Sequence, residues 1–288
     1  MLLFNKFATT TTTVWPLRRV AAVQGKTVVI TGASQGIGRA VALKLAALGA
    51  SVVVVARSED KLEELVAEIR ETGGEARAIA CDCSDPAAVE AADLGAAAPW
   101  MVVHCAGAGR FRFLTEAEAT DIKFCLDAPF LAAAHLTRKL LPGMLERGGR
   151  LVFVQSPCGI CPIAGATSYS CARWALQGLF ESLDADCAGS KLKPQIVVLG
   201  ETHSNYFSNN PGSRDRIPPL SRLLTGAALS VDEAADAVIR AVASGSRIYY
   251  APFVLRATTL FYHFFGPVVR FLLRSTSKVD YRVMMINE

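Results

Sequence analysis

Charged residues are scarce in this 288-residue chain: they make up 19% of it, against about 25% in an average soluble domain. Lys and Arg number 30 and Asp and Glu 26, so the net charge is only +4 and nucleic-acid binding is not indicated. Hydrophobic residues make up 51% of the chain, which excludes disorder as its main state. A mean hydropathy of +0.31 indicates that some apolar surface faces lipid or a partner.

Acidic residues are absent from the start of the chain, where the first is Glu59. The leader, residues 1–24, carries Lys6, Arg18 and Arg19 beside a run of hydroxylated residues at 9–13. This acid-poor, basic and hydroxylated composition is typical of a mitochondrial or plastid transit peptide. A flexible arm accounts for the same composition, and both interpretations stay open.

The chain also lacks the patterns that hold a metal or a disulfide framework. Its eight cysteines are too few for a disulfide-rich scaffold of this length and indicate a reducing, intracellular compartment. Cys158 and Cys161 form a single C-x-x-C without a second pair, and the histidines have no ligand spacing. We therefore predict no metal site, and two reduced thiols packed in a loop.

No uninterrupted run of about 18 to 20 apolar residues occurs in the C-terminal tail, residues 252–288, so it should not cross a bilayer. Its apolar residues are interrupted by the Gly266-Pro267 pair and by basic residues. On a helix these fall on one face opposite the aromatics: Arg256, His263, Arg270, Arg274 and Lys278. The pattern predicts a helix at a membrane surface, broken near Pro267, or a helix that packs against a second subunit.

Short β-branched runs alternate with amphipathic stretches from Lys26 onward. This alternation predicts one α/β domain, 25–251, built on a Rossmann-type, doubly wound, parallel sheet of seven strands. A C-terminal amphipathic extension follows the domain. We expect the strands at 27–30, 52–56, 76–81, 101–104, 151–155, 196–199 and 248–250. Helices are expected at 38–48, 59–71, 86–94, 115–147 with a break at Pro129, 168–185 and 231–243.

A glycine-rich turn follows the first expected strand and opens the first helix: Thr31-Gly32-Ala33-Ser34-Gln35-Gly36-Ile37-Gly38. Gly32 permits a tight turn, Gly36 lets the backbone approach a pyrophosphate, and Gly38 lets helix and sheet pack closely. Free N–H groups at the helix start attract phosphate oxygens. The pattern in this context predicts a dinucleotide site.

The second expected strand ends at Ala56 without the carboxylate that would accept hydrogen bonds from the ribose hydroxyls of NAD. Arg57 follows at once and supplies a forked cation that suits a 2′-phosphate. The sequence therefore predicts NADP(H) as the cofactor rather than NAD(H).

Several motifs occur in order along the chain: the glycine turn, Asp82-Cys83 after the third strand, His104-Cys105-Ala106-Gly107, Ser156, and Tyr169 thirteen residues later. Over residues 25–250 the chain resembles the short-chain dehydrogenase/reductase family. Within that family, residues 55–61 and 150–156 and the apolar, basic tail resemble those of the membrane-associated 3-ketodihydrosphingosine reductases. The resemblance implies cofactor contacts from Asp82 and its neighbour Cys83 at the adenine, Ala106 and Gly107 at the adenosine ribose, and Ser204 at the nicotinamide amide.

Carbonyl reduction needs a hydride, a proton for the developing alkoxide and a hydrogen-bond donor to the carbonyl. The resemblance assigns the proton to Tyr169 and the donor to Ser156. A free tyrosine has a pKa of about 10, so a nearby cation must stabilise its phenolate. The family uses a lysine four residues further on, and this chain has Arg173, which keeps the charge but cannot release a proton.

A second departure from the family falls at Asp127, which stands where the family has a helix asparagine that holds a relay water. A carboxylate at this position could pair with Arg173 and compete for the charge that Tyr169 needs. We state this pairing as a hypothesis.

Two functions remain in competition. One is an NADP(H)-dependent oxidoreductase that reduces a ketone, including a lipid such as a 3-ketosphingoid, with Ser156, Tyr169, Arg173 and Asp127 at its chemical site. The other is a catalytically impaired, nucleotide-binding accessory subunit of a mitochondrial membrane complex. Under both functions we expect the tail, 252–288, to hold the protein on an intracellular membrane, either that of the mitochondrion or that of the endoplasmic reticulum. The chain forms a homodimer or joins a larger complex.

Overall fold

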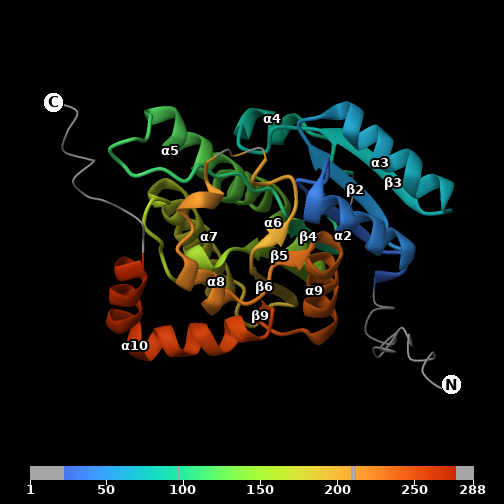
Figure 1. The fold of residues 1–288 in the computed structure, drawn as a ribbon. Coiled ribbons are helices and arrows are strands. Elements are labelled where there is room, and N and C mark those ends of the chain that lie inside the picture. Colours follow the sequence, from blue (N-terminus) through green and yellow to red (C-terminus); the bar gives the residue numbers. More distant parts are fainter. Residues whose placement is uncertain (1–22, 96–97, 209, 211, 277–288) are drawn as a thin grey trace, which may run out of the picture.

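The computed structural model describes residues 23–276, apart from 96, 97, 209 and 211. It contains a seven-stranded parallel sheet between two layers of helices (Figure 1). The strands lie in the order β3-β2-β1-β4-β5-β6-β9. Their bounds are β1 Thr27–Thr31, β2 Ser51–Ala56, β3 Glu75–Ala80, β4 Met101–His104, β5 Gly149–Gln155, β6 Leu192–Leu199 and β9 Ile248–Ala251. The predicted Rossmann-type sheet is confirmed.

Alternate residues of each strand face opposite layers, as the two-residue period of a strand requires. Val28 and Ile30 face one layer, and Val29 faces the other. The first layer consists of α2 (Gly36–Ala47), α3 (Glu59–Glu71) and α9 (Val231–Ser244). The second consists of α4 (Pro86–Ala91), α6 (Ala132–Arg147) and α7 (Thr167–Asp186). Both strand faces are therefore covered, which accounts for the continuous apolar runs in the sequence.

The predicted helix over 115–147 begins later, and its regular α-helical geometry is interrupted at Pro129, as predicted. Helix α5 covers Ala119–Leu126, and a π-helical turn, η2 (Asp127–Leu131), joins it to α6. Proline has no N–H and its ring crowds the preceding turn, so the regular hydrogen-bond ladder cannot pass it. The wider π turn absorbs this defect while the chain stays helical.

Short elements surround the carboxyl ends of the strands. They are η3 (Pro157–Gly159) after β5, and β7 (Thr202–His203), η4 (Arg214–Arg216), α8 (Pro219–Thr225) and β8 (Leu229–Ser230) between β6 and α9. A small two-stranded sheet joins β7 to β8. The segment after β6 therefore folds back over the end of the sheet where parallel α/β proteins bind ligands.

Helix α10 (Val254–Thr276) lies along the lower edge of the molecule in Figure 1 and packs against α8 and β9. Its backbone leaves helical geometry at Phe265, two residues before Pro267, so the predicted break is confirmed. Within the described part of the chain, no helix is long and apolar enough to cross a membrane. Lys278 and the leader up to residue 22 lie outside the described residues.

Candidate active site

A groove runs along the carboxyl ends of β1 and β2 and past the segments that follow β3 and β4. The glycine turn forms its floor, with Gly32 and Gly36 at positive φ, 66° and 57°. A Cβ on Gly32 would lie 2.8 Å from the Ala106 backbone, so a side chain there would block the turn. The residues predicted to hold the adenosine and phosphates line this groove, as does Ser204, which was predicted to lie at the nicotinamide amide: Thr31, Gly32, Ser34, Gln35, Gly36, Ile37, Gly38, Arg57, Asp82, Cys83, Ala106, Gly107 and Ser204.

Cations gather at the end of the groove beyond β2. Arg57 lines it together with Lys61, which lies one helical turn further along α3. Asp82 stands nearby: its partial burial acts to raise its pKa, but hydrogen bonds from Ser84 and the charge of Arg57 keep that pKa below its usual value. The bare glycine turn, its helix start and these cations fit a phosphorylated dinucleotide.

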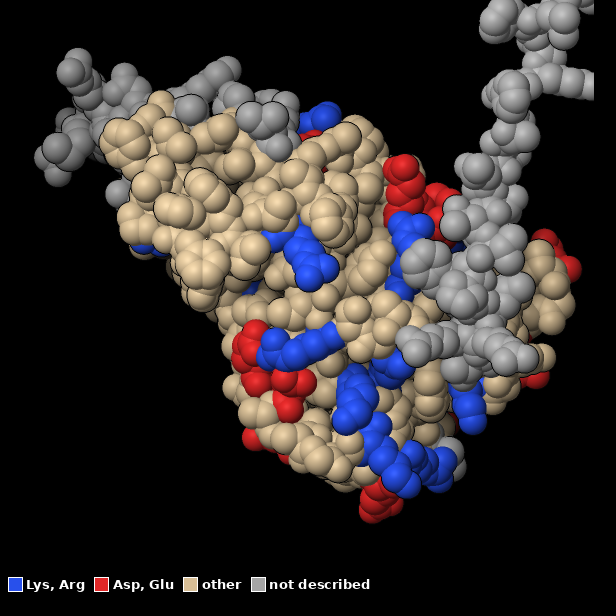
Figure 2. Space-filling model, turned by 90° about the horizontal axis from the view of Figure 1, so that it is seen from below, with Lys and Arg blue, Asp and Glu red and all other residues tan. Residues whose placement is uncertain are grey.

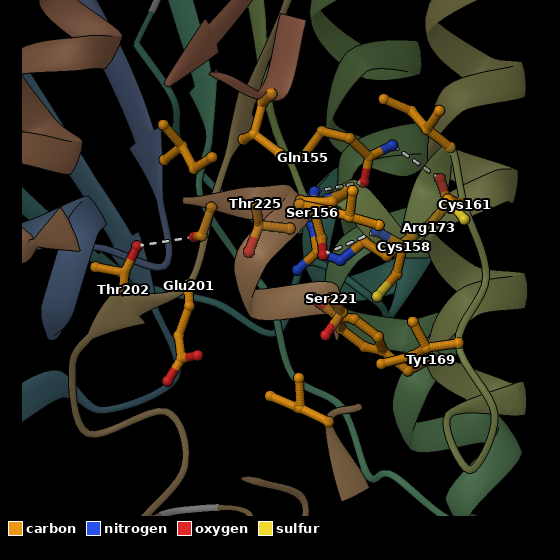
Figure 3. A pocket seen from close by; sticks show the side chains of 18 of the residues that line it. Gln155, Ser156, Cys158, Cys161, Tyr169, Arg173, Glu201, Thr202, Ser221 and Thr225 are labelled. Carbon is orange, nitrogen blue, oxygen red and sulfur yellow. Dashed lines mark hydrogen bonds between the residues drawn. The ribbon is translucent and has the colours of Figure 1, made fainter. Parts of the chain in front are cut away.

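A second pocket adjoins the groove, and Figure 3 shows it from close by. Ser156 after β5 and Tyr169 and Arg173 on α7 line one wall, while Glu201 and Thr202 line the other. Most of the remaining lining is apolar and comes from distant parts of the chain: Ile37, Phe111, Ile163, Leu224, Leu255, Val269 and Leu273. Three residues line both the pocket and the groove, namely Ile37, Ser204 and Tyr206.

Tyr169 and Ser156 lie in the same pocket but do not hydrogen bond to each other among the contacts of the described residues. The Tyr169 ring is 5% exposed and packs against Phe111, with ring centres 5.0 Å apart. The Ser156 hydroxyl accepts a hydrogen bond from the Cys158 N–H at 3.3 Å. Neighbouring residues thus hold both side chains in the wall of the pocket.

Arg173 is buried beside Tyr169. Its Nη1 donates to the Val154 carbonyl at 3.0 Å, and its guanidinium lies 5.1 Å from the centre of the Tyr169 ring. A Cβ on Gly107 would lie 2.7 Å from Nη2, so the guanidinium reaches the edge of the groove only because residue 107 is a glycine. The charge predicted for this position is present, and it lies against the tyrosine ring.

The hypothesis that Asp127 pairs with Arg173 is wrong. Asp127 accepts two hydrogen bonds from the Lys123 ammonium, at 2.7 and 2.9 Å, and lines the groove rather than the second pocket. Lys123 is four residues earlier on the same helical path, which is the spacing of neighbouring side chains. Lys123 thus balances the charge of the Asp127 carboxylate, and the Arg173 guanidinium lies against the Tyr169 ring instead.

The remaining histidine and cysteine candidates have packing contacts. His104 stacks on Phe153 and its Nε2 is 3.0 Å from the Thr137 hydroxyl, while burial lowers its pKa to about 3. Cys158 and Cys161 are in the wall of the second pocket. Across 23–95, 98–208, 210 and 212–276 no cluster of residues could hold a metal ion.

Lys61 and Tyr206 are among the lining residues that sequence reasoning missed. Lys61 could have been found from its place in the first turn of the helix expected directly after Arg57, close to the end of the second strand. Tyr206 had no such signal, because it lies in a segment of 204–224 without a motif and reaches the site only through the fold of that segment.

Residues 26–213 match the family model described as short chain dehydrogenase, so the chain belongs to that family. A short chain dehydrogenase of Pseudocercospora fijiensis is 38% identical over 207 residues, 69% of this chain and 62% of the relative. A 3-ketodihydrosphingosine reductase of Cryptococcus neoformans is 32% identical over 184 residues, 60% of this chain and 55% of the relative. The chain thus spans about three-fifths of the length of these relatives.

Solved structures bear out the fold. A short chain dehydrogenase/reductase from Burkholderia phymatum in complex with NAD superposes with a TM-score of 0.75 at 24% identity, covering 86% of this chain and 96% of that one. One from Sphingobium yanoikuyae in complex with NADPH gives 0.72 at 23% identity, covering 88% and 98%. The fold of the chain is therefore that of a known class of structures.

Proposed function

We propose that the protein is an NADP(H)-dependent oxidoreductase that reduces a ketone carried by an apolar, lipid-like molecule. The observation that carries this proposal is the junction at Ser204 and Tyr206, where the groove beside the glycine turn adjoins a largely apolar pocket lined by Ser156 and Tyr169. Hydride donor and ketone would meet at this junction.

In this reaction the bound cofactor supplies a hydride to the carbonyl carbon. The Ser156 hydroxyl donates a hydrogen bond to the carbonyl oxygen and favours the negative charge that forms there. Tyr169 gives its proton to that oxygen and becomes a phenolate. Arg173, held by the Val154 carbonyl, supplies a positive charge beside the ring.

The preference for NADP(H) over NAD(H) rests on Arg57 and Lys61. Both line the groove beyond β2, and Ala56, not a carboxylate, ends that strand. Two cations suit a 2′-phosphate, whereas NAD binding is favoured by an acceptor for the ribose hydroxyls.

An apolar substrate is favoured by the double role of α10. Its inner face contributes Leu255, Val269 and Leu273 to the pocket. Its outer face exposes large apolar side chains: Leu260, Phe261, Phe264, Phe265, Val268 and Phe271. Figure 2 views this side and shows a broad area of uncharged side chains with Lys and Arg at its border.

We propose that the outer face of α10 rests on an intracellular membrane, of the endoplasmic reticulum or the mitochondrion. Arg256, His263 and Arg270 on α10 are exposed, so they can meet anionic head groups. The tail, 252–288, then acts as the membrane-contacting segment of a domain that covers 25–251. A ketone dissolved in the bilayer would reach the pocket past this helix.

The test is NADPH consumption by the full chain with a panel of long-chain ketones that includes 3-ketodihydrosphingosine. We expect turnover that Tyr169→Phe lowers by about 1,000-fold or more, because proton donation is lost. Equal, background rates for the wild type and the variant across the panel would overturn the proposal.

A second candidate is a nucleotide-binding accessory subunit without efficient catalysis. It is favoured by the position of Arg173, whose guanidinium lies over the Tyr169 ring. Purification from native membranes separates the two: migration with a large assembly and no turnover favours the subunit, and a free dimer that turns over ketones favours the enzyme.

A further inference from the structure

A second tyrosine converges on Tyr169. Tyr206 lies in the segment after β7, and the two rings have centres 6.3 Å apart at 58°. A Cβ on Gly109 would lie 2.6 Å from the Tyr206 hydroxyl oxygen and 2.8 Å from Cε2 of Tyr169. The absence of a side chain at residue 109 therefore allows both tyrosines to occupy one small volume.

The hydroxyl of Tyr206 is buried and forms no hydrogen bond of good geometry among the described residues, and the side chain within interaction range of it as a partner is Tyr169. The titratable and charged groups that face it are Tyr169 and Arg173 on α7 and Cys158 on η3. Burial, followed by the proximity of Tyr169, raises the pKa of Tyr206 well above its usual value. The group is thus a fixed O–H donor that stays protonated at neutral pH.

A buried donor without an acceptor is costly, so such groups in native proteins call for an explanation. The neighbouring oxygen that gains negative charge during the proposed reaction is that of Tyr169. Among the described residues Arg173 forms no hydrogen bond to that oxygen: its Nη1 donates to the Val154 carbonyl, and its guanidinium lies over the ring. A donor aimed at the Tyr169 oxygen would supply what this arginine does not.

We propose that Tyr206 is a positioning residue that donates a hydrogen bond to Tyr169 when Tyr169 is a phenolate. The inference rests on the proposed function for its role in turnover. During reduction, the O–H bond of Tyr169 breaks and its proton passes to the oxygen of the reduced carbonyl, which leaves the negative charge on Tyr169. Tyr206 holds its own proton throughout, and solvent returns a proton to Tyr169 afterwards.

The first test does not need turnover. The ionisation of Tyr169 is measured from the absorbance of tyrosinate near 295 nm. In each background, wild type or Tyr206→Phe, the titration curve of the same protein with Tyr169→Phe added is subtracted. In the Tyr206→Phe background the midpoint should move upward by about one pH unit, because a donor to the charged form has been removed. Tyr249→Phe, on β9 and outside both cavities, is the matched control and should leave the midpoint in place.

An unchanged midpoint in Tyr206→Phe would overturn the assignment. Should that variant not fold, Tyr206→Gln, which keeps an N–H donor, is titrated against Tyr206→Leu, which has none. Tyr169 should ionise at a lower pH in the glutamine variant than in the leucine variant, and equal midpoints would contradict the proposal.

The second test uses the reverse reaction, alcohol oxidation with NADP+, in which the Tyr169 phenolate accepts the proton. In Tyr206→Phe the acidic limb of the plot of kcat against pH should move to higher pH by the same amount as the Tyr169 midpoint. At pH 7 this variant should therefore lose about tenfold in kcat, with KM changed less than about twofold. An equal loss at every pH would indicate a merely structural role and contradict the proposal. If wild type shows no turnover, the proposed function fails, while the absorbance titration still decides the role of Tyr206.

Discussion

The guanidinium of Arg173 lies 5.1 Å from the centre of the Tyr169 ring and is tied to the Val154 carbonyl by a hydrogen bond of 3.0 Å. The two residues are four positions apart on α7, so the helix itself sets their proximity. The charge needed for a phenolate is therefore in place, although its side chain differs from the lysine that the family resemblance implies.

Removal of that charge should slow proton transfer. We expect Arg173→Gln to lower kcat for ketone reduction by about 100-fold, because preorganised charge at the reacting group is lost. Arg173→Lys, which keeps the charge, should cost less than about tenfold. Steady-state kinetics with NADPH checks this, and an equal loss in both variants would show that shape at this position matters more than charge.

Arg57 should decide between the two nicotinamide cofactors. Arg57→Ala is expected to weaken NADPH binding by about 10- to 100-fold, the value of a charge-assisted hydrogen bond, and to leave NADH binding unchanged. The control is Arg77→Ala, since Arg77 on β3 donates to the Asp93 carbonyl and lies outside the groove. Titration calorimetry measures both affinities, and parallel losses for NADPH and NADH would refute a 2′-phosphate contact.

The outer face of α10 should bind lipid. Phe264 and Phe271 are 69% and 68% exposed, and burial of such a side chain contributes about 1.5 to 3 kcal/mol. We expect Phe264→Ser and Phe271→Ser together to lower binding to vesicles with anionic lipid by at least about tenfold. Leu145→Ser, at an exposed position of α6, is the control. Sedimentation with vesicles checks the prediction, and unchanged binding would point to a protein partner.

His104 should make the fold sensitive to acid. Burial lowers its pKa to about 3 in the folded state, below the value of about 6.5 expected when unfolded. Below pH 6.5 the unfolded chain therefore binds a proton that the folded chain does not, and stability falls as pH falls. The loss between pH 6.5 and 5 should be about 1.5 kcal/mol.

Chemical denaturation across this pH range tests the effect of His104. The dependence of the free energy of unfolding on pH should become weaker in His104→Gln. It should stay the same in His203→Gln, because His203 is exposed. Identical slopes in wild type and His104→Gln would show that other groups cause the acid sensitivity.

Features encoded by neighbouring residues could be predicted from the sequence. The glycine turn, the parallel, doubly wound sheet and the i, i+4 placement of Tyr169 and Arg173 depend on a local pattern and on standard connection rules. The kink before Pro267 follows from the chemistry of one residue.

Features that depend on competition or on distant packing could not be predicted. Asp127 could have paired with either Lys123 or Arg173. In the structure it accepts hydrogen bonds from Lys123, its neighbour on the same helical path. Tyr206 meets Tyr169 only because the segment after β7 folds back over Gly109. No spacing in the chain encodes that approach.

Calorimetric titration of the full chain with NADPH tests the central claim most directly, that a phosphorylated dinucleotide binds against the glycine turn. We predict saturable, one-to-one binding that is lost in Gly32→Val, where a side chain would collide with the Ala106 backbone. The absence of binding of both NADPH and NADH to the wild type, or undiminished binding to the variant, would contradict the account.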